Sequence, residues 1–231
     1  MKYIKIFLLI IVLFSILILL YFNKNKILQI FFKKATIESV IENLKEKESL
    51  FLESYPDFFE IKSVILIAIK EDKILEVWTK SQKIDKYILK KKYYFTASSG
   101  SLGLKLKSGD KQIPEGVYKL ISLNPNSSYH LSIKLSYPNE MDLKFAKKEN
   151  RTDLGGDIFI HGKSVSIGCI PIGDKNIEEL FYLVNHVQLV NTEIWILPVD
   201  FRKEKNLNYM GDNDAEKEVY SQLRNKLKEE L

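Results

Sequence analysis

One stretch of the sequence, residues 155–174 (GGDIFIHGKSVSIGCIPIGD), contains the residue types that nucleophilic chemistry needs. Cys169 is the chain's single cysteine, and a thiol is the strongest nucleophile among the side chains present. His161 precedes it by eight residues, which is enough for the end of a strand to loop back and bring the two side chains together. Because a neighbouring imidazole can hold a cysteine as thiolate, the pattern predicts Cys169 as nucleophile and His161 as general base.

Two glycines beside these residues fit the same hypothesis. Gly162 and Gly168 permit tight turns and the close approach of another backbone, and the N–H groups of Gly168 and Cys169 could form an oxyanion hole. The competing interpretation is that Cys169 is an inert, buried small hydrophobe, as lone cysteines usually are. The pattern alone leaves both interpretations open. Thiol reactivity separates them, because an activated thiolate alkylates near neutral pH and an inert cysteine does not.

The elements expected to position this stretch are mainly β-strands. Runs rich in β-branched and aromatic residues lie at 63–69, 74–79, 93–98, 116–121, 130–135, 157–161 and 193–197. The first two are separated by the four residues KEDK, which predicts a hairpin. Apolar residues at helical spacing predict helices over 36–51, from Asp174 onward and near the C-terminus, with Thr36 and Asp174 as N-caps. We therefore expect a mainly β domain with peripheral helices.

The composition narrows the classes of site and partner. The 231 residues carry a formal net charge of +5 with 45% apolar residues, which is typical of a globular protein. The small, evenly spread charge gives no reason to expect a nucleic-acid partner. One cysteine excludes a disulfide scaffold, and His161 and Cys169 lack the further ligand that a zinc site needs. We therefore expect no metal and no cofactor.

Residues 6–22 (IFLLIIVLFSILILLYF) predict an N-terminal transmembrane helix, because they contain one serine and no charge. Such a helix spans about 25 Å, slightly less than a hydrocarbon core of about 30 Å. A cleaved signal peptide fits less well, because no small-x-small cleavage site follows the run. Lysines on both sides leave the orientation of the chain open.

Several further motifs follow one another in a fixed order along the chain. They are SGSLG at 99–103, GDKQIPEGVY at 109–118, LNPNSSYHLS at 123–132, YPN at 137–139, and IHG followed by SIGC up to Cys169. Over roughly residues 63–202 this series resembles the L,D-transpeptidase (YkuD-type) catalytic domain family, and its YafK-like branch in particular. The resemblance implies an L,D-transpeptidase-like β-sandwich or barrel with peripheral helices.

The resemblance also implies chemistry on peptidoglycan stem peptides. In that family a cysteine thiolate attacks the L-to-D peptide bond at stem residue three, and an amine or water then resolves the acyl-enzyme. The implied roles are nucleophile (Cys169), general base (His161), oxyanion turn and positioning (Gly168, Ser166), and substrate binding (His130, Gly162, Tyr129). For His130, a strand histidine satisfied by the backbone is an equal alternative.

Two departures from the family pattern bear on the outcome of the reaction. Ile167 and Pro171 stand where many members carry a second histidine and an arginine or asparagine, a difference that the YafK-like branch shares. The leading hypothesis is a membrane-anchored peptidoglycan-modifying cysteine enzyme. The alternatives are a hydrolase of the same fold, acting as an L,D-carboxypeptidase or amidase, and a catalytically silent wall-binding module.

The expected organisation places these functions along the chain. It consists of a membrane anchor (1–22), a juxtamembrane helical segment (23–62), the catalytic domain (63–202) and a C-terminal helical tail (203–231). The chain is expected in the inner (cytoplasmic) membrane as a single-pass protein. Its catalytic domain is expected to face the periplasm or the cell exterior, because peptidoglycan exists only there.

Overall fold

The computed structural model describes residues 6, 12–16, 18–21 and 34–231. The chain divides into two units, residues 1–35 and 36–231, so the part of the expected juxtamembrane segment from residue 36 folds with the second unit. The transmembrane helix expected at 6–22 falls partly outside the described residues, since residues 7–11, 17 and 22 are not among them. Among those that are described, no helix combines the length and the apolar character needed to cross a membrane.

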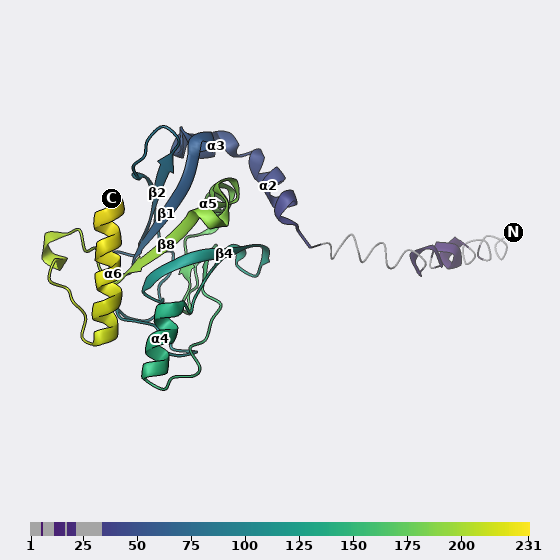
Figure 1. Ribbon diagram of the computed structural model, residues 1–231. Coiled ribbons are helices and arrows are strands. Elements are labelled where there is room, and N and C mark those ends of the chain that lie inside the picture. The colour runs from purple at the N-terminus through teal and green to yellow at the C-terminus, as the bar shows by residue number, and fades with distance from the viewer. Residues whose placement is uncertain (1–5, 7–11, 17, 22–33) are drawn as a thin grey trace. The chain divides into compact units, whose positions relative to one another are not determined.

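Within the described residues, the strands of the second unit form an eight-stranded sheet with the order β3-β2-β1-β8-β4-β5-β6-β7. The pairs β1–β8 and β6–β7 are parallel and the other neighbours are antiparallel. This arrangement, with helices around it (Figure 1), confirms the mainly β prediction. The strands are β1 (Ile61–Ile69), β2 (Ile74–Ser81), β3 (Ile88–Tyr94), β4 (Gly116–Ser127), β5 (His130–Leu135), β6 (Phe159–His161), β7 (Ile170–Pro171) and β8 (Thr192–Leu197).

Most strand predictions hold, and the exceptions have physical reasons. The β1–β2 hairpin and the bounds of β5 are confirmed. The strand expected at 93–98 lies earlier, at β3, which is an edge strand of the sheet. Its lysines 90–92 hid it from a search for apolar runs, although charged side chains are common on edge strands. The two-residue strand β7 is too short to give a sequence pattern.

The helices are α2 (Ile37–Lys45), α3 (Glu48–Ser54), α4 (Glu140–Lys148), α5 (Asp174–Val187) and α6 (Asp214–Glu230), with 3-10 turns at Phe58–Glu60, Leu189–Asn191 and Glu204–Asn206. Thr36 caps α2 through a capping box with Ser39, as predicted, but the single helix expected over 36–51 is interrupted after Lys45. The prediction that Asp174 caps α5 is wrong. The N-cap is Gly173, and an oxygen of Asp174 instead accepts the N–H of Lys163 at 2.7 Å.

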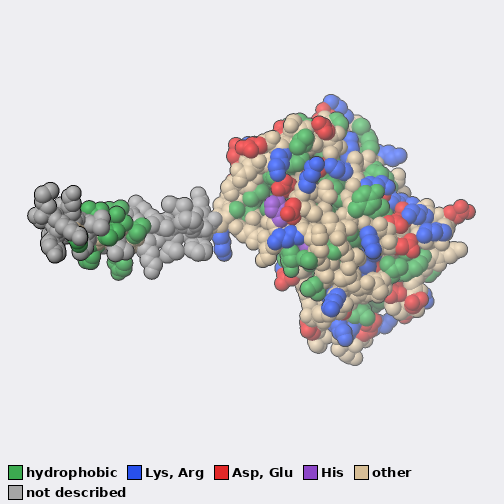
Figure 2. Space-filling model, turned by 180° about the vertical axis from the view of Figure 1, so that it is seen from behind, with side chains coloured by type: hydrophobic (Ala, Val, Ile, Leu, Met, Phe, Trp, Pro, Cys, Tyr) green, Lys and Arg blue, Asp and Glu red, His purple; other side chains and the backbone are tan. Residues whose placement is uncertain are grey.

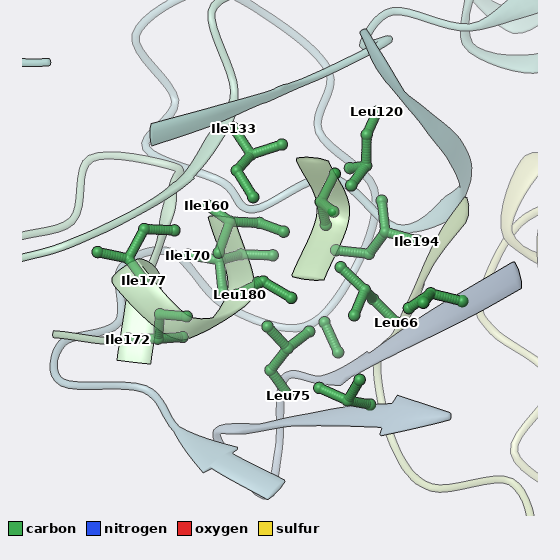
Figure 3. Packing of buried hydrophobic residues seen from close by; sticks show 14 of the residues in the cluster. Leu66, Leu75, Leu120, Ile133, Ile160, Ile170, Ile172, Ile177, Leu180 and Ile194 are labelled. Carbon is green, nitrogen blue, oxygen red and sulfur yellow. The ribbon is translucent and has the colours of Figure 1, made fainter. Parts of the chain in front are cut away.

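Both faces of the sheet are covered by hydrophobic side chains. Along β1, Leu66 belongs to the cluster that includes α5, and Ile67 belongs to the opposite cluster, which includes α6. Successive residues of a strand point to opposite faces, which explains why the sequence of β1 is apolar without alternation. Figure 3 shows the first cluster, where Leu180 from α5 packs toward Leu66 and the strands. The C-terminal helix α6 therefore packs on the domain.

A buried charged cluster fastens α6 to the sheet. Glu115 accepts hydrogen bonds from the ammonium of Lys70 at 2.7 Å and from the hydroxyl of Tyr220, on α6, at 2.6 Å. The side chains of Lys70 and Glu115 are 4% and 0% exposed. Lys70 also donates to the carbonyls of Gly103 and Ile113. Burial lowers the pKa of Lys70, and the nearby Glu115 carboxylate opposes that shift.

Glu115→Gln is expected to lower the free energy of unfolding by roughly 3–5 kcal/mol, because it leaves a buried ammonium without its counter-charge. Glu218→Gln is the matched control, since its ion pair with Lys144 lies on the surface, where such pairs contribute less than about 1 kcal/mol. Urea unfolding of both variants measures the difference. Equal, small losses would show that the Lys70–Glu115 pair contributes little to stability.

Candidate active site

His161 ends strand β6, and its side chain is held in one orientation. The residue is 1% exposed, and its Nδ1 lies 2.6 Å from the carbonyl oxygen of Gly162. Because a carbonyl oxygen can only accept, Nδ1 carries the proton and Nε2 is left as the basic nitrogen. The ring of Tyr129 packs on the imidazole with a centroid distance of 4.6 Å. This arrangement prepares His161 to accept a proton at Nε2.

Cys169 lies beside the same strand. Strands β6 and β7 are parallel, with Ile160 paired to Ile170 and His161 paired to Pro171. Cys169 directly precedes Ile170, so its backbone adjoins the strand that ends at His161. In this register Cys169 lies beside Phe159, at the start of β6, whereas His161 ends that strand, so the two predicted residues are two positions apart along the β6–β7 pair.

The thiol of Cys169 is not hydrogen-bonded to the imidazole in this structure. Among the described residues, its Sγ donates to the carbonyl oxygen of Asp157 at 3.7 Å. The expected direct contact between Cys169 and His161 is therefore absent in this resting arrangement. Transfer of the thiol proton to Nε2 requires the side chain of Cys169 to leave the Asp157 carbonyl. Catalytic hydrogen bonds often tighten only once substrate is bound.

Burial favours the neutral form of both groups. Desolvation raises the pKa of the Cys169 thiol, opposed by the N–H of Phe159 and the charge of Lys105. Desolvation also lowers the pKa of His161, opposed by the carbonyl of Gly162. The resting site is therefore a thiol and a neutral imidazole. These shifts run against the expectation of a thiolate already activated near neutral pH, and alkylation of Cys169 tests it.

Alkylation of Cys169 by iodoacetamide is expected to be slower at pH 7–8 than that of an ordinary thiol, with a midpoint above the usual pKa of about 8.5. The sign follows from the raised pKa, because only the thiolate reacts and its fraction at a given pH is reduced. The urea-unfolded chain is the control, since it exposes the same single cysteine. A folded-state midpoint below that of the unfolded chain would contradict the expectation.

The turn before the nucleophile is tightly packed. Gly168 has φ +103°, and a Cβ at this position would lie 2.9 Å from the carbonyl oxygen of Gln112, so only glycine fits. The N–H of Gly168 donates to Oγ of Ser99 at 2.8 Å. It is therefore already paired, and the geometry supports the positioning role predicted for Gly168. Ser166 donates to the carbonyl of Cys169 at 2.8 Å, which also holds the turn.

The three residues predicted to bind substrate have different surroundings. Tyr129 is 40% exposed and covers the ring of His161. Gly162 is buried, and a Cβ there would lie 2.5 Å from Oδ1 of Asp174, so it contributes packing and its carbonyl rather than a substrate contact. His130 bonds to the side chain of Glu178 on α5 at 2.8 Å, which is not the backbone partner of the alternative interpretation.

Residues near the site that sequence reasoning gave no role are now visible. The carbonyl of Asp157 accepts the thiol, and its carboxylate pairs with Lys134 at 2.6 Å. The hydroxyl of Ser99 joins the turn at Gly168. Ser99 lies in a motif that carried the family resemblance, which was the available signal. Asp157 acts through its main chain, which leaves no sequence signal.

Charged groups are mixed around the domain. Acidic and basic side chains are interspersed over the face seen in Figure 2, with histidine atoms at the surface among them. In the part of the chain that the structure describes, no group of three or more His, Cys, Asp or Glu side chains is arranged to hold a metal ion.

Comparison with known proteins decides the family. Residues 62–200 match the YkuD family, described as the L,D-transpeptidase catalytic domain. The chain belongs to this L,D-transpeptidase family. The match confirms the resemblance over almost the whole of the expected catalytic domain, and it includes His161, Cys169 and the Ser99 motif. The family implies a peptidoglycan-modifying enzyme.

Relatives of this L,D-transpeptidase domain are found among both sequences and structures. The chain is 33% identical over 117 residues to "Putative L,D-transpeptidase YafK" of Escherichia coli K12, covering 50% of this chain and 44% of the relative. It therefore spans less than half the length of that relative. Among solved structures, it is similar to Pgp2, a helical cell shape determining protein of Campylobacter jejuni (24% identity, 66% and 55% of the two chains, TM-score 0.48). It is also similar to Bd1075 of Bdellovibrio bacteriovorus (18% identity, 74% and 60%, TM-score 0.41).

Proposed function

We propose that this chain is a cysteine enzyme that attacks the L-to-D peptide bond at residue three of a peptidoglycan stem peptide and forms an acyl-enzyme on Cys169. One observation carries the proposal. The chain's single cysteine directly precedes β7 and lies beside strand β6, which ends at a buried histidine whose Nδ1 is fixed by the carbonyl of Gly162. That arrangement supplies a nucleophile and a base on neighbouring strands of an L,D-transpeptidase domain.

The proposed reaction has two steps. In the first, Nε2 of His161 takes the thiol proton as Sγ of Cys169 bonds to the carbonyl carbon. The C–N bond then breaks, and the imidazolium gives its proton to the leaving amine of D-alanine. In the second, an amine or water attacks the thioester and His161 accepts the proton of that nucleophile. The C–S bond then breaks, and the imidazolium returns the proton to Sγ to regenerate the thiol. An amine gives a cross-link, and water gives a shortened stem.

Neutral resting groups are compatible with this sequence. Since the pKa of the thiol is raised and that of the imidazole is lowered, proton transfer accompanies the attack rather than preceding it. A neutral thiol is also less prone to adventitious oxidation or alkylation, because these reactions need the thiolate. Charge forms at the carbonyl oxygen only during attack, where backbone N–H groups stabilise it best.

The proposal extends to location. Residues 6–22 contain an uncharged apolar run, which supports an anchor in the inner membrane with residues 36–231 on the periplasmic or outer side. The position of the substrate supports that side. Sedimentation of the full chain with membranes, and its loss when residues 1–35 are removed, is the expected result. A full chain that stays soluble would contradict the anchor.

The function is tested with residues 36–231, which contain both hydrophobic clusters. Purified tetrapeptide muropeptides are incubated with this unit and the products are identified by mass spectrometry. Cysteine-dependent dimers establish a transpeptidase, and cysteine-dependent loss of D-alanine alone establishes a carboxypeptidase. Intact sacculi with attached proteins extend the test to an amidase. No cysteine-dependent change in any of these substrates would overturn the enzyme proposal and favour a wall-binding module.

A further inference from the structure

We propose that Ser99 is a positioning residue for this reaction, because its hydroxyl holds the turn that carries Cys169. This inference rests on the proposed function and adds to it a residue outside the His161–Cys169 segment. Ser99 is distant from that segment in sequence, and it lies in the loop between β3 and β4. Ser99 contacts the turn only because the fold brings two segments that are distant in sequence together.

The hydroxyl oxygen of Ser99 has three hydrogen-bonding partners, which lie on two segments of the chain. It accepts the N–H of Gly168 at 2.8 Å, lies 2.9 Å from the carbonyl oxygen of Lys111, and lies 2.9 Å from Oγ of Ser166. Ser166 in turn donates to the carbonyl of Cys169 at 2.8 Å. The turn 166–169 is therefore tied to the 99–112 loop at Ser166 and at Gly168.

Counting the hydroxyl protons shows which group donates and which accepts in each of these hydrogen bonds. Each serine hydroxyl has one proton. Ser166 gives its proton to the Cys169 carbonyl, so the proton of Ser99 is shared between the Lys111 carbonyl and Oγ of Ser166. The N–H of Gly168 then fills an acceptor site of Ser99. An alanine at 99 would leave the N–H of Gly168 without its acceptor.

The loop that carries Ser99 is itself held by hydrogen bonds, which keep the Ser99 hydroxyl in place. The side chain of Gln112 accepts the N–H of Ser101 at 2.7 Å. Glu115 accepts the N–H of Gly103 at 2.8 Å, and Lys70 donates to the carbonyl of Ile113 at 2.9 Å. The buried pair of Lys70 and Glu115 therefore helps to hold the 99–112 loop, and this loop holds the turn 166–169 through Ser99.

The chemical consequence concerns the oxyanion. Since the N–H of Gly168 is committed to Ser99, the N–H of Cys169 is the remaining donor of the pair considered for the oxyanion hole. Its direction depends on the peptide plane between Gly168 and Cys169. The N–H bond to Ser99 fixes the plane before Gly168, and the bond from Ser166 fixes the plane after Cys169. Ser99 and Ser166 therefore fix the direction of the Cys169 N–H, although neither side chain donates to the oxyanion itself.

The test compares Ser99→Ala with Ser99→Thr, which keeps a hydroxyl, in residues 36–231. Ser164→Ala is the matched control, because Ser164 is exposed on the same segment as Cys169. For Ser99→Ala we expect kcat on tetrapeptide muropeptides to fall about 10–100-fold with KM changed less than about twofold, because misplaced reacting groups cost about that much. Ser99→Thr is expected to recover most of kcat, and Ser164→Ala to match the unchanged protein.

Amide hydrogen exchange of the segment 166–169 gives a readout that does not depend on activity. Loss of the acceptor at 99 is expected to speed exchange of the Gly168 N–H at least about tenfold, with exchange in the β1–β2 hairpin unchanged. Unchanged exchange, or unchanged kcat in Ser99→Ala, would overturn the inference. If the protein without any substitution is inactive on every muropeptide, the proposed function is overturned and the positioning role with it. The exchange measurement would still report whether Ser99 holds the Gly168 N–H.

Discussion

Replacing Cys169 with alanine is expected to reduce turnover of stem peptides by roughly 10⁴-fold or more, because removal of a catalytic nucleophile removes the covalent route. Product release from tetrapeptide muropeptides, measured by mass spectrometry at equal protein concentrations, gives the ratio. Cys169→Ser should be similarly inactive, since a neutral hydroxyl is a far weaker nucleophile than a thiol.

The fold of these two variants is expected to remain intact. Cys169 is only partly buried, and its side chain makes a single weak hydrogen bond, to the carbonyl of Asp157. The thermal midpoint should therefore shift by only a few degrees, as expected for a change of less than about 1 kcal/mol. Turnover within tenfold of the unchanged protein in folded Cys169→Ala would contradict the assigned nucleophile.

Replacing His161 with glutamine is expected to reduce kcat by about 10²–10⁴-fold, the usual contribution of general acid–base catalysis. The amide of glutamine can donate to the carbonyl of Gly162 as Nδ1 does, but it cannot accept the thiol proton. His186→Gln is the matched control. That histidine stacks on Phe58 at 4.4 Å, far along α5 from the residues of the site, so its replacement should leave kcat unchanged.

The pH profile makes the assignment of His161 specific. Because burial lowers the pKa of His161, the imidazole stays neutral into mildly acidic solution. The acid limb of kcat/KM is then expected below the ordinary histidine pKa of about 6.5, and it should vanish in His161→Gln. An acid limb that persists unchanged in this variant would show that another group is the base.

Much of the fold could be predicted from the sequence where the local pattern and the tertiary structure agree. The apolar run of β1 and the turn that follows it specify a hairpin, and Thr36 begins a helix where its side chain can cap one. Prediction failed where contacts between residues distant in sequence decide the role of a side chain. Asp174 has the side chain of a typical N-cap, but its carboxylate accepts the backbone N–H of Lys163 instead.

The site shows the same division. Cys169 and His161 could be proposed as nucleophile and base from residue type and spacing, and these roles stay a prediction. Their resting relation could not, because the thiol bonds to the carbonyl of Asp157, a main-chain atom that any residue type would supply. Ser99 also remained without a role, because its contact with Gly168 joins positions 69 residues apart.

The most direct test of the account is to find the acyl group itself. Residues 36–231 are mixed with excess tetrapeptide muropeptide and quenched in acid at times from milliseconds to minutes, and the intact mass and the proteolytic peptides are then measured. The account predicts an adduct of the stem peptide without its terminal D-alanine, mapped to Cys169 and absent from Cys169→Ala. Release of D-alanine with no adduct at any time, and at the same rate after Cys169 has been alkylated, would contradict it.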